Sequence, residues 1–156
     1  MKPGVLAIVL PLCVLADNPQ AVAADGLCAP LRAFIASVKP GEIHSLSFHT
    51  IWGGGFKGSD ESSFYEKGCE QNSYEPAKGV CADLMENGSV EFAGENAKRA
   101  ISCLSTKTRF SSGTLLHGIS FSMTVGTDNR GSHVDIRYAE DEEWGGMVLT
   151  IIAHGY

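Results

Sequence analysis

Residues 74–104 contain two amphipathic helical patterns joined by a short turn, and this stretch limits the fold more than any other. In each pattern the apolar residues recur on one side of a 3.6-residue period, which is typical of a helix that packs by one face. Two such faces need a partner surface, and strands elsewhere in the chain must supply it. The first face consists of Ala77, Val80, Cys81, Leu84 and Met85, and the second of Ala93, Ala97, Ala100, Ile101 and Leu104.

The residues around the turn favour two separate helices. Pro76 suits the first helical position, where its missing N–H would have no partner anyway. We expect Gly88 to end the first helix in the left-handed conformation and Ser89 to cap the second. Lys98 and Arg99 fall on the side opposite to the second apolar face. Because the connection is short, the two helices are predicted to lie antiparallel.

The remaining pattern is mostly that of a sheet. Apolar and polar residues alternate in residues 43–52, 114–125 and 133–138, which predicts strands with one buried face. Residues 147–154 are apolar on both parities, so we expect this strand inside the sheet. Residues 27–38 carry another helical stripe. The predicted class is α+β: an antiparallel sheet of about four strands, with an N-terminal helix and a helical hairpin packed on one face.

Residues 53–75 form a long segment between the first strand and the helical pair. A glycine-rich turn opens it, and we predict a short helix over residues 59–67 that begins at Ser59 and ends at Gly68. Aromatic residues favour binding surfaces, although they could equally cover an open sheet edge. The aromatic residues of this region are Trp52, Phe56, Phe64, Tyr65 and Tyr74.

The first two dozen residues have the pattern of a signal peptide. Lys2 supplies a positive start, residues 5–16 are apolar, and Ala21 and Ala23 are small residues of the kind that a signal peptidase reads. The apolar run is shorter than the ~20 residues that a membrane span needs. We therefore predict a signal peptide in residues 1–23 and a single α+β domain in residues 24–156. The domain is expected in the periplasm or outside the cell, with no membrane span in the mature chain.

Export changes how the cysteines are interpreted. Four of the five remain after residue 23, and an even number in an oxidising compartment predicts two disulfides. Three connectivities are open, and we favour Cys69–Cys81 and Cys28–Cys103. The first pair would tie the long segment to the helical pair, and the second would tie the N-terminal helix to its end. A zinc site is disfavoured because no C-x-x-C spacing occurs.

Charge and motifs exclude several function classes. The net charge is −6, which opposes binding to nucleic acid and favours a basic partner. No HExxH or calcium-loop pattern occurs, although the turn over residues 140–143 is acidic. We therefore predict no cofactor, no metal site and no nucleic-acid partner.

An enzyme would have to use the polar side of the strands. Several serines lie on this polar side together with His49, His133, Asp135 and Arg137. The nucleophile elbow G-x-S-x-G, which positions a catalytic serine in many hydrolases, does not occur in the sequence. Solvated strand residues would give the same pattern.

Two main hypotheses follow from these features. The first is a small exported, disulfide-bonded binding protein without enzymatic activity, such as an inhibitor or immunity protein that acts on another protein. The second is a small secreted hydrolase or ligand-binding enzyme that uses the polar sheet face; a structural envelope protein is a third alternative. For the binding protein, the predicted contact residues are Trp52, Phe56, Trp144, Asp141, Glu142 and Glu143.

Overall fold

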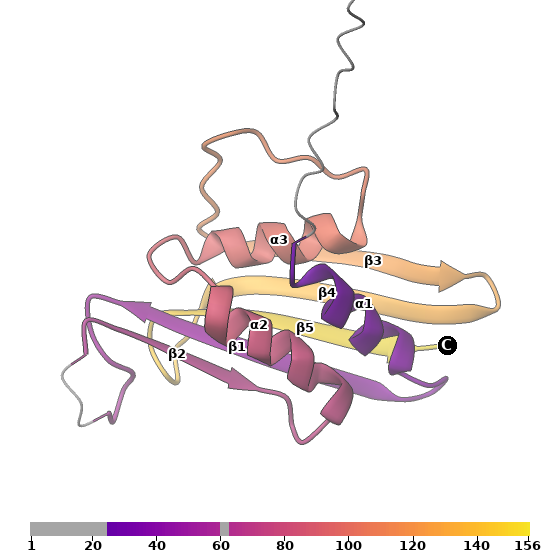
Figure 1. The fold of residues 1–156 in the computed structure, drawn as a ribbon, viewed down its shortest axis with the longest axis horizontal. Coiled ribbons are helices and arrows are strands. Elements are labelled where there is room, and N and C mark those ends of the chain that lie inside the picture. The colour runs from indigo at the N-terminus through magenta and orange to yellow at the C-terminus, as the bar shows by residue number, and fades with distance from the viewer. Residues whose placement is uncertain (1–24, 60–62) are drawn as a thin grey trace, which may run out of the picture.

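The computed structural model describes residues 25–59 and 63–156, so the predicted signal peptide lies outside the described residues. Helices α1 (Cys28–Ser37), α2 (Lys78–Asn87) and α3 (Gly94–Leu104) lie on one face of a five-stranded antiparallel sheet (Figure 1). The strands are β1 (Ile43–Trp52), β2 (Tyr65–Glu70), β3 (Ile119–Thr127), β4 (Arg130–Glu140) and β5 (Met147–Gly155), and a short 3₁₀ helix η1 (Glu75–Ala77) leads into α2. The predicted α+β class is confirmed.

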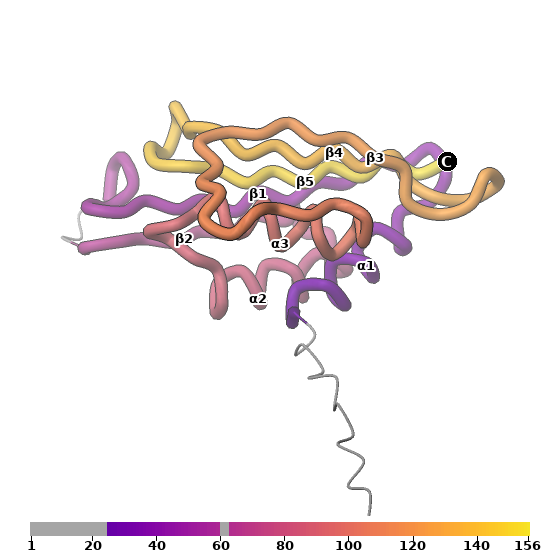
Figure 2. The backbone as a smooth tube through the Cα atoms, turned by 90° about the horizontal axis from the view of Figure 1, so that it is seen from above, coloured from indigo at the N-terminus to yellow at the C-terminus, as the bar shows by residue number. Residues whose placement is uncertain are grey.

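The strands lie in the order β2-β1-β5-β4-β3. The strand predicted over residues 43–52 is β1, and β5 occupies the centre of the sheet, as its apolar residues on both parities predicted. Three helix-facing side chains of β5, those of Leu149, Ile151 and Ala153, are buried, and the side chains on the other face are half-buried. Among the described residues, no helix covers that other face, which we call the open face (Figure 2).

The fifth strand is a correction to the prediction. Residues 65–67 were expected to end a short helix, but Tyr65–Glu70 is β2, and it pairs with β1 from Trp52↔Tyr65 to Ser47↔Glu70. Its sequence, YEKGCE, has three charged residues and a glycine, which gives it a low intrinsic preference for a strand. Pairing with β1 and the disulfide at Cys69 overcome this preference.

The core lies between the helices and the sheet. Phe34 of α1, Phe48 of β1 and Ile101 of α3 are almost completely buried there. Four residues of the predicted apolar face of α3 are buried in one continuous hydrophobic cluster, and the fifth, Leu104, is partly buried against it. The four buried residues are Ala93, Ala97, Ala100 and Ile101.

Lys98 departs from the predicted pattern of α3. It was expected on the exposed side, but it is buried beneath the segment that follows the helix. Its ammonium group donates to Glu95 and to the carbonyl of Thr114. The residues that bury it lie beyond the helix, so the helical period alone could not reveal its position.

The link between α2 and α3 is longer than predicted. Gly88 is extended (φ −66°, ψ 135°) rather than left-handed, and a Cβ there would come within 2.8 Å of the Phe48 ring. Ser89 does not cap α3, which begins at Gly94; its hydroxyl instead accepts from the backbone N–H of Phe92 at 3.2 Å. The buried side chain of Asn96 holds the link by bonding both the N–H and the carbonyl of Ser89.

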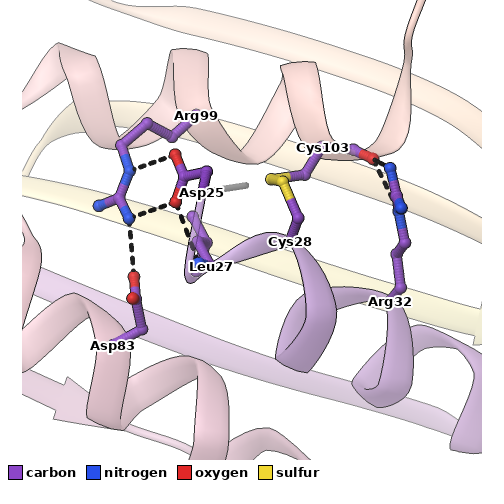
Figure 3. The surroundings of a disulfide bond; sticks show 7 residues. All are labelled: Asp25, Leu27, Cys28, Arg32, Asp83, Arg99 and Cys103. Carbon is purple, nitrogen blue, oxygen red and sulfur yellow. Dashed lines mark hydrogen bonds and ion pairs between the residues drawn. A yellow bond between two sulfur atoms is a disulfide. The ribbon is translucent and has the colours of Figure 1, made fainter. Parts of the chain in front are cut away.

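Both predicted disulfides are present. Cys28–Cys103 joins α1 to the end of α3, and Cys69–Cys81 joins β2 to α2. Figure 3 shows the contacts around the first bond: two nitrogens of Arg32 donate to the carbonyl of Cys103, at 3.0 and 2.7 Å.

Arg99 of α3 forms ion pairs with α2 and with the segment just before α1 (Figure 3). Its guanidinium donates to both carboxylate oxygens of Asp25, at 2.8 and 2.6 Å, and to Asp83 of α2 at 2.8 Å. The hydrogen bonds from Arg99 lower the pKa of Asp25 below its usual value, although burial acts in the opposite direction. The helical layer is therefore held by covalent and ionic links as well as by its core.

Candidate functional site

Three connecting segments meet at one end of the sheet (Figure 1). These are the β1–β2 loop, the β4–β5 loop and the α2–α3 link. Between them run three adjoining hollows of about 620, 390 and 290 Å³, and Glu91 lines all three. We call this continuous depression the end groove. Its principal lining residues are Trp52, Tyr65, Glu91, Phe92, Leu115, Tyr138, Glu140 and Glu142.

Large apolar side chains are exposed along the end groove. Trp52 is 48% exposed at the last residue of β1, and it lies between the largest and the smallest hollow. Its ring meets Phe64 edge-on at 4.8 Å and stacks over Tyr65 at 6.3 Å. Phe92 and Leu115 are each more than half exposed farther along the groove. Contiguous apolar surface of this kind usually marks a site of interaction.

The end groove is also acidic. Glu91, Glu140 and Glu142 line it, and among the described residues their carboxylates have no hydrogen-bond or ion-pair partner. Lys57 lies beside them, but its ammonium group donates to the backbone carbonyl of Glu142 at 2.6 Å rather than to a carboxylate. Unpaired carboxylates beside a hollow attract a positively charged ligand.

The other side of the β4–β5 loop is turned inward onto His49. Nδ1 of His49 lies 2.5 Å from Oδ2 of Asp141, and both side chains are more than nine-tenths buried. The indole of Trp144 stacks on the imidazole at 4.2 Å, and the ring of Phe56 lies edge-on to both. Nε2 of His49 is buried and has no hydrogen-bond partner in the part of the chain that the structure describes; a carboxylate oxygen of Glu70 lies 3.8 Å away.

Asp141 also shapes the loop itself. Its Oδ1 accepts from the backbone N–H groups of Glu143 and Trp144, each at 3.0 Å. Burial opposes ionisation of this carboxyl, but the hydrogen bonds from Trp144, His49 and Glu143 outweigh it, so its pKa lies below the ordinary value. The ionised carboxylate therefore holds His49 and the loop turn together.

Gly68 explains why Trp144 can cover His49. This residue of β2 faces the indole, and a Cβ there would lie 2.9 Å from Cζ3 of Trp144. A real Cβ would require the ring to shift. A glycine in a strand often marks such a close approach.

The six predicted contact residues fall into two groups. Trp52 and Glu142 are exposed and line the end groove, whereas Phe56, Asp141 and Trp144 gather around His49. Asp141 belongs to both places, because it also lines the largest hollow of the groove. Glu143 is exposed but lines none of the three hollows. Sequence reasoning did not find Glu91, Phe92 or Leu115. Phe92 could have been noticed, because it is a large aromatic residue outside the apolar face of its helical pattern.

The predicted polar residues do share the open face, but they do not converge. His49 is on β1, and His133, Asp135 and Arg137 are on β4, with β5 between the two strands. His133 contacts Thr124 across the β3–β4 pair at 3.0 Å, and Asp135 accepts from Ser122 at 2.5 Å. Each of these two side chains therefore has a cross-strand partner of its own.

Within residues 25–59 and 63–156, no three His, Cys, Asp or Glu side chains are grouped so that they could hold a metal ion. Across the same residues, no helix has the length and apolar character to cross a membrane. Comparisons with known protein families, with characterised proteins and with solved structures gave no match to this chain.

Proposed function

We propose that this chain is an exported binding protein without enzymatic activity, and that its end groove holds a basic, extended segment of another protein. An inhibitor or immunity protein would act in this way. The observation that carries the proposal is the exposed Trp52 beside the unpaired carboxylates of Glu91, Glu140 and Glu142. The two disulfides are compatible with export.

A lysine or arginine side chain would find two kinds of partner in the groove. The carboxylates of Glu91 and Glu140 offer ion pairs, and the face of Trp52 offers a cation–π contact with the same cation. The apolar surface of Phe92 and Leu115 would accommodate the neighbouring side chains of an extended segment. Aromatic anchors with a charged rim are the usual composition of a protein-binding surface.

The groove is held in shape before any partner binds. The backbone N–H of Lys57 donates to the carbonyl of Trp144 at 2.8 Å and so joins the β1–β2 and β4–β5 loops. The side chain of Asn96 fixes the α2–α3 link through its two hydrogen bonds to the backbone of Ser89. A preformed site loses less conformational entropy on binding, which favours affinity.

A peptide-display selection tests the proposal even when the natural partner has not been identified. Selection on the wild-type protein should enrich peptides that contain lysine or arginine, and binding should weaken as salt is raised. Trp52→Ala should lower the affinity of the selected peptides roughly tenfold or more. Ile43→Ala is the matched control, because Ile43 is an apolar residue 63% exposed at the opposite end of β1.

The charge requirement has its own control. Glu91→Gln with Glu140→Gln should weaken binding, whereas Glu86→Gln with Asp128→Asn removes the same charge from exposed sites outside the groove and should not. Equal binding by both double variants, or a selection without basic peptides, would refute the proposal.

A second candidate, a hydrolase, is supported by the pair of His49 and Asp141. A carboxylate 2.5 Å from Nδ1 is the arrangement that orients a general base, which would act through Nε2. Trp144 covers that nitrogen, so a substrate would have to displace the indole. Turnover of ester, glycoside or peptide substrates that His49→Gln abolishes would favour the enzyme over the binding protein.

A further inference from the structure

The two edges of the sheet differ in their protection. Edge strand β2 has six residues, of which Glu66, Lys67 and Glu70 are charged, and Cys69 ties it to α2. Charges and covering elements of this kind prevent an edge strand from pairing with another chain. Strand β3 lies at the opposite edge of the sheet (Figure 1). It has nine residues, and none of them is charged.

Within the described ranges 25–59 and 63–156, strand β3 has a hydrogen-bonded neighbour, β4, on one side only. On its core-facing side Phe121, Met123 and Val125 are only half-buried against the core, and on its open-face side Ser120 and Ser122 are exposed. At roughly 3.4 Å per residue the unpaired edge is about 30 Å long. Such an edge is a template for a further strand.

We propose that β3 pairs antiparallel with β3 of a second copy of this chain, which would join the two sheets into one. A two-fold axis through the centre of the strand brings like residues together, because each position and its partner then lie on the same face. Phe121, Met123 and Val125 would meet the same apolar row in the second copy, and the hydroxyl row would meet its own counterpart. The strand is in this sense its own complement.

The charge distribution favours this flank for self-association. Residues 105–138, which include β3, contain four basic and two acidic residues, whereas the rest of the chain contains eight basic and sixteen acidic ones. Pairing through β3 therefore keeps the strongly acidic parts of the two copies apart. None of residues 119–127 lines the end groove, so a dimer would leave both grooves open.

Sedimentation equilibrium from low micromolar to near-millimolar protein tests the pairing. The wild-type chain should reach twice its monomer mass, and hydrogen exchange at β3 amides should slow as the protein concentration rises. Ser120→Lys with Ser122→Lys should raise the dimer dissociation constant about tenfold or more, because each copy then carries two positive charges on the edge that must pair, and those at position 122 lie diagonally across the two-fold axis.

Ser111→Lys with Ser112→Lys is the matched control, since it makes the same exchanges at exposed positions outside the strand. This variant should dimerise like the wild type, and equal melting temperatures of the two double variants would show that both are folded. A chain that stays monomeric at the highest concentration would overturn the proposal. A dimer that survives the lysines in β3 would overturn it as well, because it must then use another surface.

Discussion

The helical layer and the loop end of the molecule are stabilised in different ways. Arg99 of α3 is paired with Asp83 of α2 and with Asp25 just before α1, and the Cys28–Cys103 bond adds a covalent tie between α1 and α3. At the loop end, the part of the chain that the structure describes shows no disulfide and no arginine link; it is held by the contacts of Asp141, His49 and Trp144. The exposed apolar surface of the end groove also lies there. We therefore expect substitutions in the helical layer to lower the free energy of unfolding strongly, and substitutions at the loop end to lower it less.

The largest effect is expected from a charge in the helical layer. Ile101 is fully buried in α3, and Ile101→Asp would place an unpaired carboxylate in the core at a cost of several kcal/mol. We expect this variant to lose its folded state, as measured by circular dichroism and by dispersion of its amide NMR signals. Ser102→Asp is the control, because the next residue of the same helix is exposed and should cost less than about 1 kcal/mol. An Ile101→Asp variant as heat-stable as the wild type would contradict the assignment of this face to the core.

The two disulfides should differ in how much each contributes to the stability of the fold. Cys28–Cys103 closes 75 residues of sequence separation and Cys69–Cys81 closes 12. In the chain-entropy model, their removal costs about 4.5 and about 3 kcal/mol respectively. Urea unfolding of the double alanine variants should show this order. As a control, non-reducing mass spectrometry of the intact protein should find a mass four hydrogens below that of the reduced form. If removal of Cys69–Cys81 destabilises the protein more than removal of Cys28–Cys103, strain or residual structure in the unfolded chain outweighs loop length.

Much of this architecture was predictable because it depends on how apolar and polar residues repeat along each segment of the sequence. The strand at residues 43–52, the central position of β5 and the buried face of α3 all follow from the spacing of apolar residues. The cysteine pairing followed from the expected positions of the same elements. β2 was missed because its stability comes from β1 and from a disulfide rather than from its own charged sequence.

The candidate site was less predictable for a related reason. The end groove combines Trp52 from the end of β1, Glu91 from the α2–α3 link and Leu115 from the segment before β3. No spacing rule relates these three positions, and only the register of the sheet brings them to one end. Trp52 and Glu142 could be proposed from composition, whereas the inward position of Trp144 depends on the glycine at position 68.

A smaller effect is expected from the ionised carboxylate at the loop end. The pKa of Asp141 is lowered in the folded state, so its contribution to stability is present above the unfolded value near 3.9 and is lost as pH falls through the folded pKa. Asp141→Asn should therefore lower stability by about 1–2 kcal/mol at neutral pH and by progressively less below about pH 4. Urea midpoints measured across pH check this. A destabilisation that stays constant down to pH 2 would show that the charge of Asp141 does not matter.

The smallest effect should come from the contact between β2 and the β4–β5 loop. In Gly68→Ala the new methyl group would meet the indole of Trp144, which is only half-buried and can shift away from His49. We expect a loss of about 1 kcal/mol, at the low end of the cost of overpacking, together with a change in tryptophan emission. Gly54→Ala is the control, because a Cβ at that position has nothing within 4 Å.

The same variant tests whether the inward side of the β4–β5 loop affects binding in the end groove. If Gly68→Ala leaves the affinity of the selected basic peptides unchanged, the two sides of the loop are independent. If the affinity falls with the emission change, the stacking of Trp144 on His49 positions Glu142 for binding, and the two sides of the loop act as one unit.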